Sequence, residues 1–174
     1  KILISGSVEP IEVKIYEALV NTIEENGFSQ ILEKELKTTE PTSSKVLKLL
    51  SKLQDHLAKD SQFSGIVMII DELGKFVQFA GRNKNQGDLF LLQQLAENTA
   101  LAHQCSFNLI AMLHQSLDVY AKDLDEETKN EWKKIQGRFN EISFIESPEQ
   151  SIRILAQAIQ QKFSSQDAKK INTE

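Results

Sequence analysis

Two adjacent carboxylates, Asp71 and Glu72, carry the strongest chemical signal in this sequence. They follow the apolar run 66–70 (Ile-Val-Met-Ile-Ile), which predicts a strand buried on both faces, as in the middle of a parallel sheet. An acid at the end of such a strand can hold the water shell of Mg²⁺, because a hard cation prefers oxygen ligands. The second acid can orient and deprotonate an attacking water molecule. The alternative is structural, with Asp71 capping the following turn and Glu72 solvated.

Another group of polar residues follows a second predicted strand. Residues 107–113 are largely apolar and lead directly into His114, Gln115 and Ser116. Because carboxyl ends of parallel strands meet at one edge, His114 or Gln115 can there hydrogen-bond a γ-phosphate or the attacking water. The alternative is that Ser116 caps a helix and His114 is a structural residue.

Arg138 is the third candidate, since it lies just past a predicted helix, beside Gly137. Its guanidinium can reach an anion and, acting in trans, can complete the site of a neighbouring subunit by neutralising phosphoryl charge. The alternative is a surface salt bridge with Glu131 or Glu141.

The elements that position these residues alternate between short apolar runs and helical patterns. Strands are predicted at residues 1–5, 65–70, 107–113 and 142–145, and helices begin near residues 10, 43, 88, 125 and 148. Such alternation predicts right-handed crossovers and a parallel sheet with helices on both faces. We therefore expect an α/β three-layer sandwich with a mostly parallel sheet of about four strands. It forms one domain over residues 1–163, followed by a polar tail at 164–174.

Local signals mark the ends of several elements. Asp88 is placed to cap a helix, and residues 147–150 (Ser-Pro-Glu-Gln) form a capping box. The polar stretch 81–87 reads as a loop that contains Arg82 and Lys84. The last helix is expected to bury one apolar face, made of Ile152, Leu155, Ala156, Ile159 and Phe163.

Composition narrows the class of protein. The chain has 174 residues and a net charge of −5. Its single cysteine excludes a disulfide framework or a cysteine-based zinc cage within the chain, and it suits the reducing cytoplasm. No apolar run reaches the roughly 18 residues that a membrane span needs. The acidic balance argues against a dominant nucleic-acid surface, although the basic residues Arg82 and Lys84 leave a local contact open.

Taken together, the candidate residues resemble those of a known family. The run 66–72 looks like the Walker B strand of P-loop ATPases of the additional-strand, catalytic-glutamate division, which includes AAA+ proteins and STAND-like relatives. Residues 71–76, 113–116 and 130–139 look more specifically like large bacterial ATP-binding proteins. The resemblance implies ATP and Mg²⁺ as cofactors, a cytoplasmic hydrolase and, if Arg138 acts in trans, a homo-oligomer. It makes Asp71 the Mg²⁺-site aspartate, Glu72 the catalytic glutamate, His114 or Gln115 the sensor, and Arg138 an arginine finger or late sensor.

The sequence departs from that family at one essential motif. These ATPases hold the phosphates with a G-x-x-x-x-G-K-[ST] loop, and no such segment occurs among the 174 residues. We expect the loop and its strand to precede residue 1 in a longer protein. That strand normally lies between the sensor strand and the last strand, so its absence should leave a gap or force the predicted strand 142–145 to pair differently.

The resulting interpretation is the Walker B and sensor portion of an ATP-hydrolysing domain, inactive alone. The alternatives are a non-catalytic α/β binding or regulatory module and a metal-dependent phosphohydrolase.

Overall fold

The computed structural model describes residues 1–32, 40–60, 62–83, 87–100, 105–115, 119–120, 126–143 and 147–162. The chain divides into two units, Lys1–Phe139 and Asn140–Glu174. The first unit contains the sheet and every predicted site residue, and the described residues of the second form one helix.

Three parallel strands form the sheet of the first unit. They are β1 (Ile2–Ser5), β2 (Gly65–Asp71) and β3 (Ser106–Ala111), in the order β1-β2-β3. The α/β class and the parallel sheet are thus confirmed, and β2 is the middle strand. The described part of the chain has three strands where about four were expected. Ile142 and Ser143 are not in a strand, and the rest of that predicted strand lies outside the described residues.

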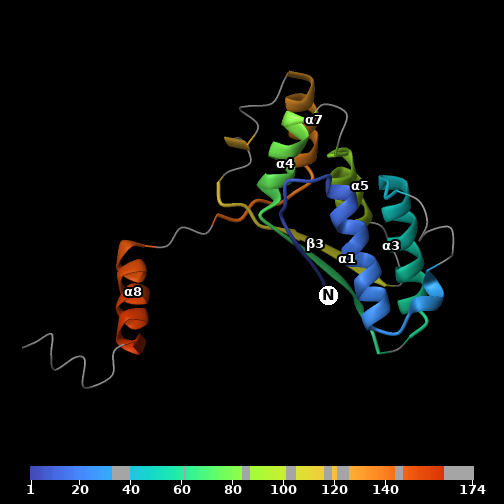
Figure 1. Cartoon of the computed structure of the whole chain (residues 1–174), viewed down its shortest axis with the longest axis horizontal. Helices are drawn as coiled ribbons and strands as arrows, with labels where there is room; N and C mark the ends of the chain where they lie inside the picture. The colour runs from blue at the N-terminus through green and yellow to red at the C-terminus, as the bar shows by residue number, and fades with distance from the viewer. Residues whose placement is uncertain are drawn as a thin grey trace, which may run out of the picture. The chain divides into compact units, whose positions relative to one another are not determined.

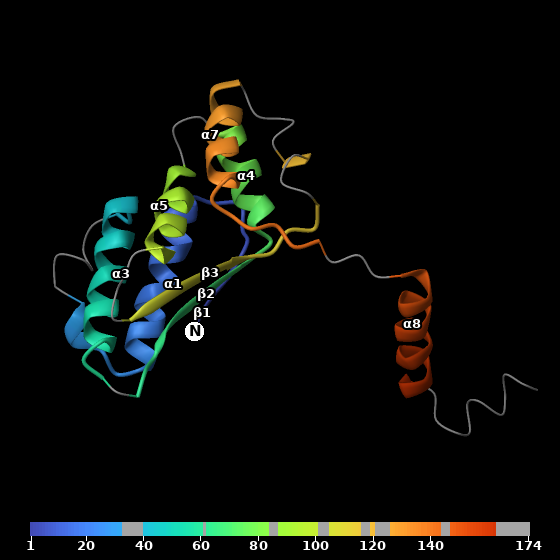
Figure 2. The ribbon, with the colours of Figure 1, turned by 180° about the vertical axis from the view of Figure 1, so that it is seen from behind.

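Helices pack against one face of the sheet. The described residues form α1 (Ile11–Glu25), the short 3₁₀ helix η1 (Ser29–Ile31), α3 (Ser43–Leu57), α4 (Leu73–Arg82), α5 (Phe90–Thr99) and α7 (Glu126–Gln136). Helix α1 contacts β1, α3 contacts β2, and α5 contacts β3, while α7 packs on α5. Figures 1 and 2 show α4 continuing upward from the end of β2, beyond the sheet.

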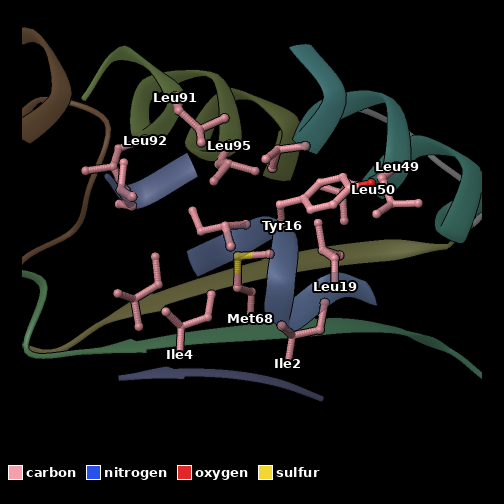
Figure 3. Packing of buried hydrophobic residues seen from close by; sticks show 14 of the residues in the cluster. Ile2, Ile4, Tyr16, Leu19, Leu49, Leu50, Met68, Leu91, Leu92 and Leu95 are labelled. Carbon is pink, nitrogen blue, oxygen red and sulfur yellow. The ribbon is translucent and has the colours of Figure 1, made fainter. Parts of the chain in front are cut away.

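The core lies between this helical layer and one face of the sheet. Figure 3 shows Ile2, Ile4 and Met68 directed towards Leu19 of α1 and the leucines of α3 and α5. Side chains alternate along a strand, so the residues between these belong to the opposite face.

The opposite face is partly open, which differs from the three-layer prediction. Leu3 is 58% exposed and Ile110 is 47% exposed, and in β2 only the alternate residues Ile66, Met68 and Ile70 are buried. The prediction that β2 is buried on both faces was therefore wrong, because the described helices of this unit cover one side only.

Asp88 hydrogen-bonds the backbone at the start of α5, as the sequence predicted. Asp88 accepts a hydrogen bond from the Phe90 N–H (3.1 Å) at the start of α5. Its carboxylate also accepts from the Ser43 hydroxyl at the start of α3, and its own N–H donates to Glu12 of α1 (3.0 Å). Asp88 thus joins three helices in addition to capping one.

Helix α4 was not predicted. Its residues Leu73, Phe76 and Val77 are buried and recur at helical spacing, so the signal was present in the sequence. Arg82 accordingly lies in a helix and not in the expected loop, and Lys84 lies outside the described residues.

The second unit contains α8 (Pro148–Lys162). Its predicted capping box is confirmed: Ser147 and Gln150 exchange two backbone-to-side-chain hydrogen bonds, both 3.4 Å. Within this unit the predicted burial is not found: Ile152 and Leu155 are 65% and 62% exposed, and Ala156 is exposed too. The described part of this unit has no second element on which α8 can pack, and the side chains of Ile159 and Phe163 lie outside the description. Among the described helices, none combines the length and the apolar character needed to cross a membrane.

One pair of neighbouring substitutions tests the one-sided packing. Ile4→Ala should lower the free energy of unfolding by about 2–5 kcal/mol, because it empties a buried position. Leu3→Ala, its matched control on the exposed face, should change it by about 0.5 kcal/mol or less. Urea denaturation measures both, and equal losses would show that both faces of the sheet are covered.

Candidate functional site

The two acids lie at the carboxyl end of the middle strand. Asp71 is exposed, and its Oδ1 accepts a hydrogen bond from the Glu72 N–H (2.8 Å). The Gly6 N–H, just past β1, donates to the Asp71 carbonyl (2.9 Å), and the Leu73 N–H donates to the Met112 carbonyl (3.1 Å). Both neighbouring strands therefore hold the turn that carries the acids.

Glu72 has a left-handed backbone conformation, with φ 52° and ψ 41°. In the described part of the chain it is the one residue other than glycine with positive φ. This conformation is sterically unfavourable for a residue with a Cβ, and such residues concentrate at functional sites. The turn at Glu72 ends β2 and starts α4 without an intervening loop.

Two glycines allow the chain to approach this turn closely. A Cβ on Gly6 would lie 2.3 Å from the Glu72 carbonyl oxygen, and a Cβ on Gly74 would lie 2.1 Å from the Tyr120 ring. Any larger residue at either position would force the backbone or the ring to move. These roles were not predicted. The signal for them was the position of each glycine, Gly6 directly after the first strand and Gly74 two residues after the acidic pair.

The Glu72 carboxylate contacts two basic side chains. Lys75 Nζ lies 2.6 Å from Oε2, and His114 Nε2, from the segment after β3, lies 3.5 Å from Oε1. The hydrogen bond from Lys75 holds the pKa of the Glu72 carboxyl below its ordinary value; partial burial opposes this and His114 adds to it. The structure therefore favours an ionised carboxylate that is a weaker base than a free glutamate.

Lys75 was not predicted as a site residue. Its spacing of three from Glu72 on a helix is the signal that would have identified it. The pair is part-exposed, with the Glu72 and Lys75 side chains 31% and 44% accessible.

The other predicted residues have different placements. His114 lies beside Glu72. Gln115 is exposed and makes no hydrogen bond with the described residues. Ser116 is not among the residues that the structure describes. Arg138 pairs with Glu97 of α5 (3.0 Å) and not with either glutamate considered from the sequence. No contact between described residues joins Arg138 to the acidic pair.

Further polar atoms lie at the end of β1. Ser5 is opposite Asp71 in the strand register, and the buried Ser7 hydroxyl oxygen has no hydrogen-bond partner among the described residues. The described residues contain no cluster of three or more His, Cys, Asp or Glu side chains that could bind a metal ion directly. The exposed Asp71 carboxylate can instead contact a hydrated cation through water, the mode in which Mg²⁺ keeps most of its shell.

Comparison of the chain with models of protein families, with curated proteins and with solved structures found no match.

The ion pair at Glu72 makes a testable prediction. Lys75→Met should raise the pKa of the Glu72 carboxyl towards the ordinary glutamate value of about 4.3, because it removes the main group that stabilises the charge. NMR titration of ¹³C-labelled glutamate side chains measures this directly.

Lys129→Met is the matched control, since Lys129 forms a similar pair with Glu126 at 3.3 Å in α7. It should leave the Glu72 titration unchanged. Because folding lowers the Glu72 pKa, the pair stabilises the folded chain above the unfolded pKa, and this is lost as the pH falls through the folded value. An unchanged Glu72 titration in Lys75→Met would contradict the ion pair.

Proposed function

We propose that this chain supplies the Walker B and sensor portion of an ATP-hydrolysing P-loop domain of the AAA+ or STAND-like kind. One observation carries the proposal. Asp71 and Glu72 end the middle strand of a parallel sheet, and His114, after the adjacent strand, lies 3.5 Å from Glu72. In open α/β sheets, ligands bind at the carboxyl ends of the strands, where these side chains lie.

The proposed roles follow from the chemistry of each side chain. Asp71, whose carboxylate is exposed, would hold Mg²⁺ through its water shell. Glu72 would orient and deprotonate the attacking water, and His114 or Gln115 would hydrogen-bond the γ-phosphate. Bound Mg²⁺ would neutralise charge on the phosphates. We assign no role in hydrolysis to Arg138, because its guanidinium is paired with Glu97.

The backbone at Glu72 supports a functional reading over a structural one. Glycine or asparagine adopts the left-handed conformation more readily than glutamate does, and residues held in it concentrate at functional sites. The neighbouring strands fix this conformation, and it directs the carboxylate towards the segment after β3.

The phosphate grip has to come from a segment outside these 174 residues, because the sequence has no glycine-rich loop ending in Lys-Ser or Lys-Thr. We assign the strand that precedes this loop to the outer edge of β3. In the described sheet β3 pairs with β2 alone, so that edge is open to another strand.

Calorimetry on the 174-residue chain tests the first consequence. Titration with Mg-ATP should give no measurable heat of binding, because the groups that grip the triphosphate are missing. Micromolar affinity would contradict the proposal and would require a different phosphate site.

A second experiment tests the catalytic role of Glu72. In a protein that joins this chain to its phosphate loop, Glu72→Gln should lower the rate of ATP hydrolysis by roughly 10²–10⁴-fold, with ATP still bound, because it removes the general base. Glu25→Gln, at the exposed end of α1, is the control and should leave the rate unchanged. An unchanged rate in Glu72→Gln would instead favour the non-catalytic regulatory module.

A further inference from the structure

Lys75 is the one charged residue in the first turn of α4, and the proposed chemistry gives it no role. Its backbone N–H donates to the Glu72 carbonyl (3.0 Å). The turn around it is tightly packed, because Leu73 is buried and Gly74 lies directly against the Tyr120 ring. The backbone from which the Lys75 side chain extends is therefore fixed relative to Glu72.

The ion pair between Lys75 and Glu72 differs from an ordinary pair on a helix surface. Lys129 and Glu126 have the same spacing in α7, but they are 3.3 Å apart and the Glu126 side chain is 88% accessible. Lys75 Nζ lies 2.6 Å from Glu72 Oε2, and the Glu72 side chain is 31% accessible. The other oxygen of this carboxylate faces His114 at 3.5 Å. Exposed pairs gain little because both side chains must give up free rotation to meet, and Glu72 has less of that freedom to lose.

We propose that Lys75 is a positioning residue, which holds the Glu72 carboxylate with Oε1 directed towards the segment after β3. This inference rests on the proposed function, which places the contact with the γ-phosphate in that segment and makes Glu72 the general base. In this role Lys75 contacts neither the nucleotide nor the attacking water, and it acts through Glu72 alone. A carboxylate that rotates freely is in the productive orientation for only part of the time, and the rate of proton transfer falls with that fraction.

A direct grip on the triphosphate is the competing role for Lys75. The ammonium would then have to leave Glu72 Oε2, so the carboxylate would face the negative phosphates without its lysine partner. Among the described residues, His114 is the other basic side chain beside Glu72, and an imidazole is only partly charged near neutral pH. Two negative groups would then lie close together, which Coulomb repulsion opposes. The positioning role avoids this, because it keeps the cation on the carboxylate.

NMR on the intact 174-residue chain tests the positioning directly. Three-bond couplings should show Glu72 in one dominant χ1 and χ2 rotamer, because two basic groups hold its carboxylate. Lys75→Met should give couplings averaged over several rotamers, and Lys75→Arg, which keeps the charge and the donor, should retain the single rotamer. Lys129→Met is the matched control and should leave the Glu72 couplings unchanged. Rotamer averaging in the unmodified chain would overturn the proposal, whether or not the variants fold.

Steady-state kinetics tests the consequence for hydrolysis in a protein that joins this chain to its phosphate loop. Lys75→Met should lower kcat by about three- to fivefold, as an ion pair at the upper end of the range for exposed pairs allows, and should leave the KM for ATP within about twofold. Lys75→Arg should restore kcat, and Lys129→Met should not alter it. Combined with Glu72→Gln, Lys75→Met should cause no further loss, because it acts only through that carboxylate.

The possible results separate this inference from the proposed function. If Glu72→Gln lowers the rate and Lys75→Met does not, the positioning role is wrong and the general base stands. If Glu72→Gln itself leaves the rate unchanged, the proposed function fails and the positioning role fails with it. In Lys75→Met, a raised KM at constant kcat would assign the lysine to the nucleotide, and a raised kcat would make it an inhibitory contact. Either of these two results would also overturn the proposal.

Discussion

The backbone turn at Asp71 and Glu72 is the constraint on which the site depends. Hydrogen bonds from Gly6 and Leu73 tie this turn to the segments after β1 and β3. Because the middle strand is held from both sides, the backbone can keep an unfavourable left-handed residue at its end. That residue sets the direction of α4, which brings Lys75 to Glu72, and it places the carboxylate within reach of His114.

Much of the fold could be predicted because its signals are local. The apolar stripe of α1, the capping box of α8 and the five apolar residues of β2 each come from residues close together in the sequence. The missed helix α4 also had a local signal, but its last two residues belong to the polar stretch 81–87 that was expected to be a loop. Burial depends on distant elements, so the open face of the sheet could not be seen in the sequence.

The candidate site shows the same division. The rule that parallel strands end at a common edge was enough to select Asp71, Glu72 and His114 together. It could not give the pairing of Arg138 with Glu97, because that contact depends on how α5 lies beside the segment after α7. The left-handed backbone at Glu72 was equally invisible, since glutamate has no local preference for it.

Asp88 has a consequence for how this unit folds. Its hydrogen bonds to Ser43 and Glu12 join residues separated by 45 and 76 positions in the chain. Two long loops must therefore close before Asp88 meets both partners, through its carboxylate and its N–H, and the entropy of closing them opposes early formation of the junction. Once formed, the junction links three helices at one residue, so the helical layer is expected to be lost as one cooperative block and not helix by helix.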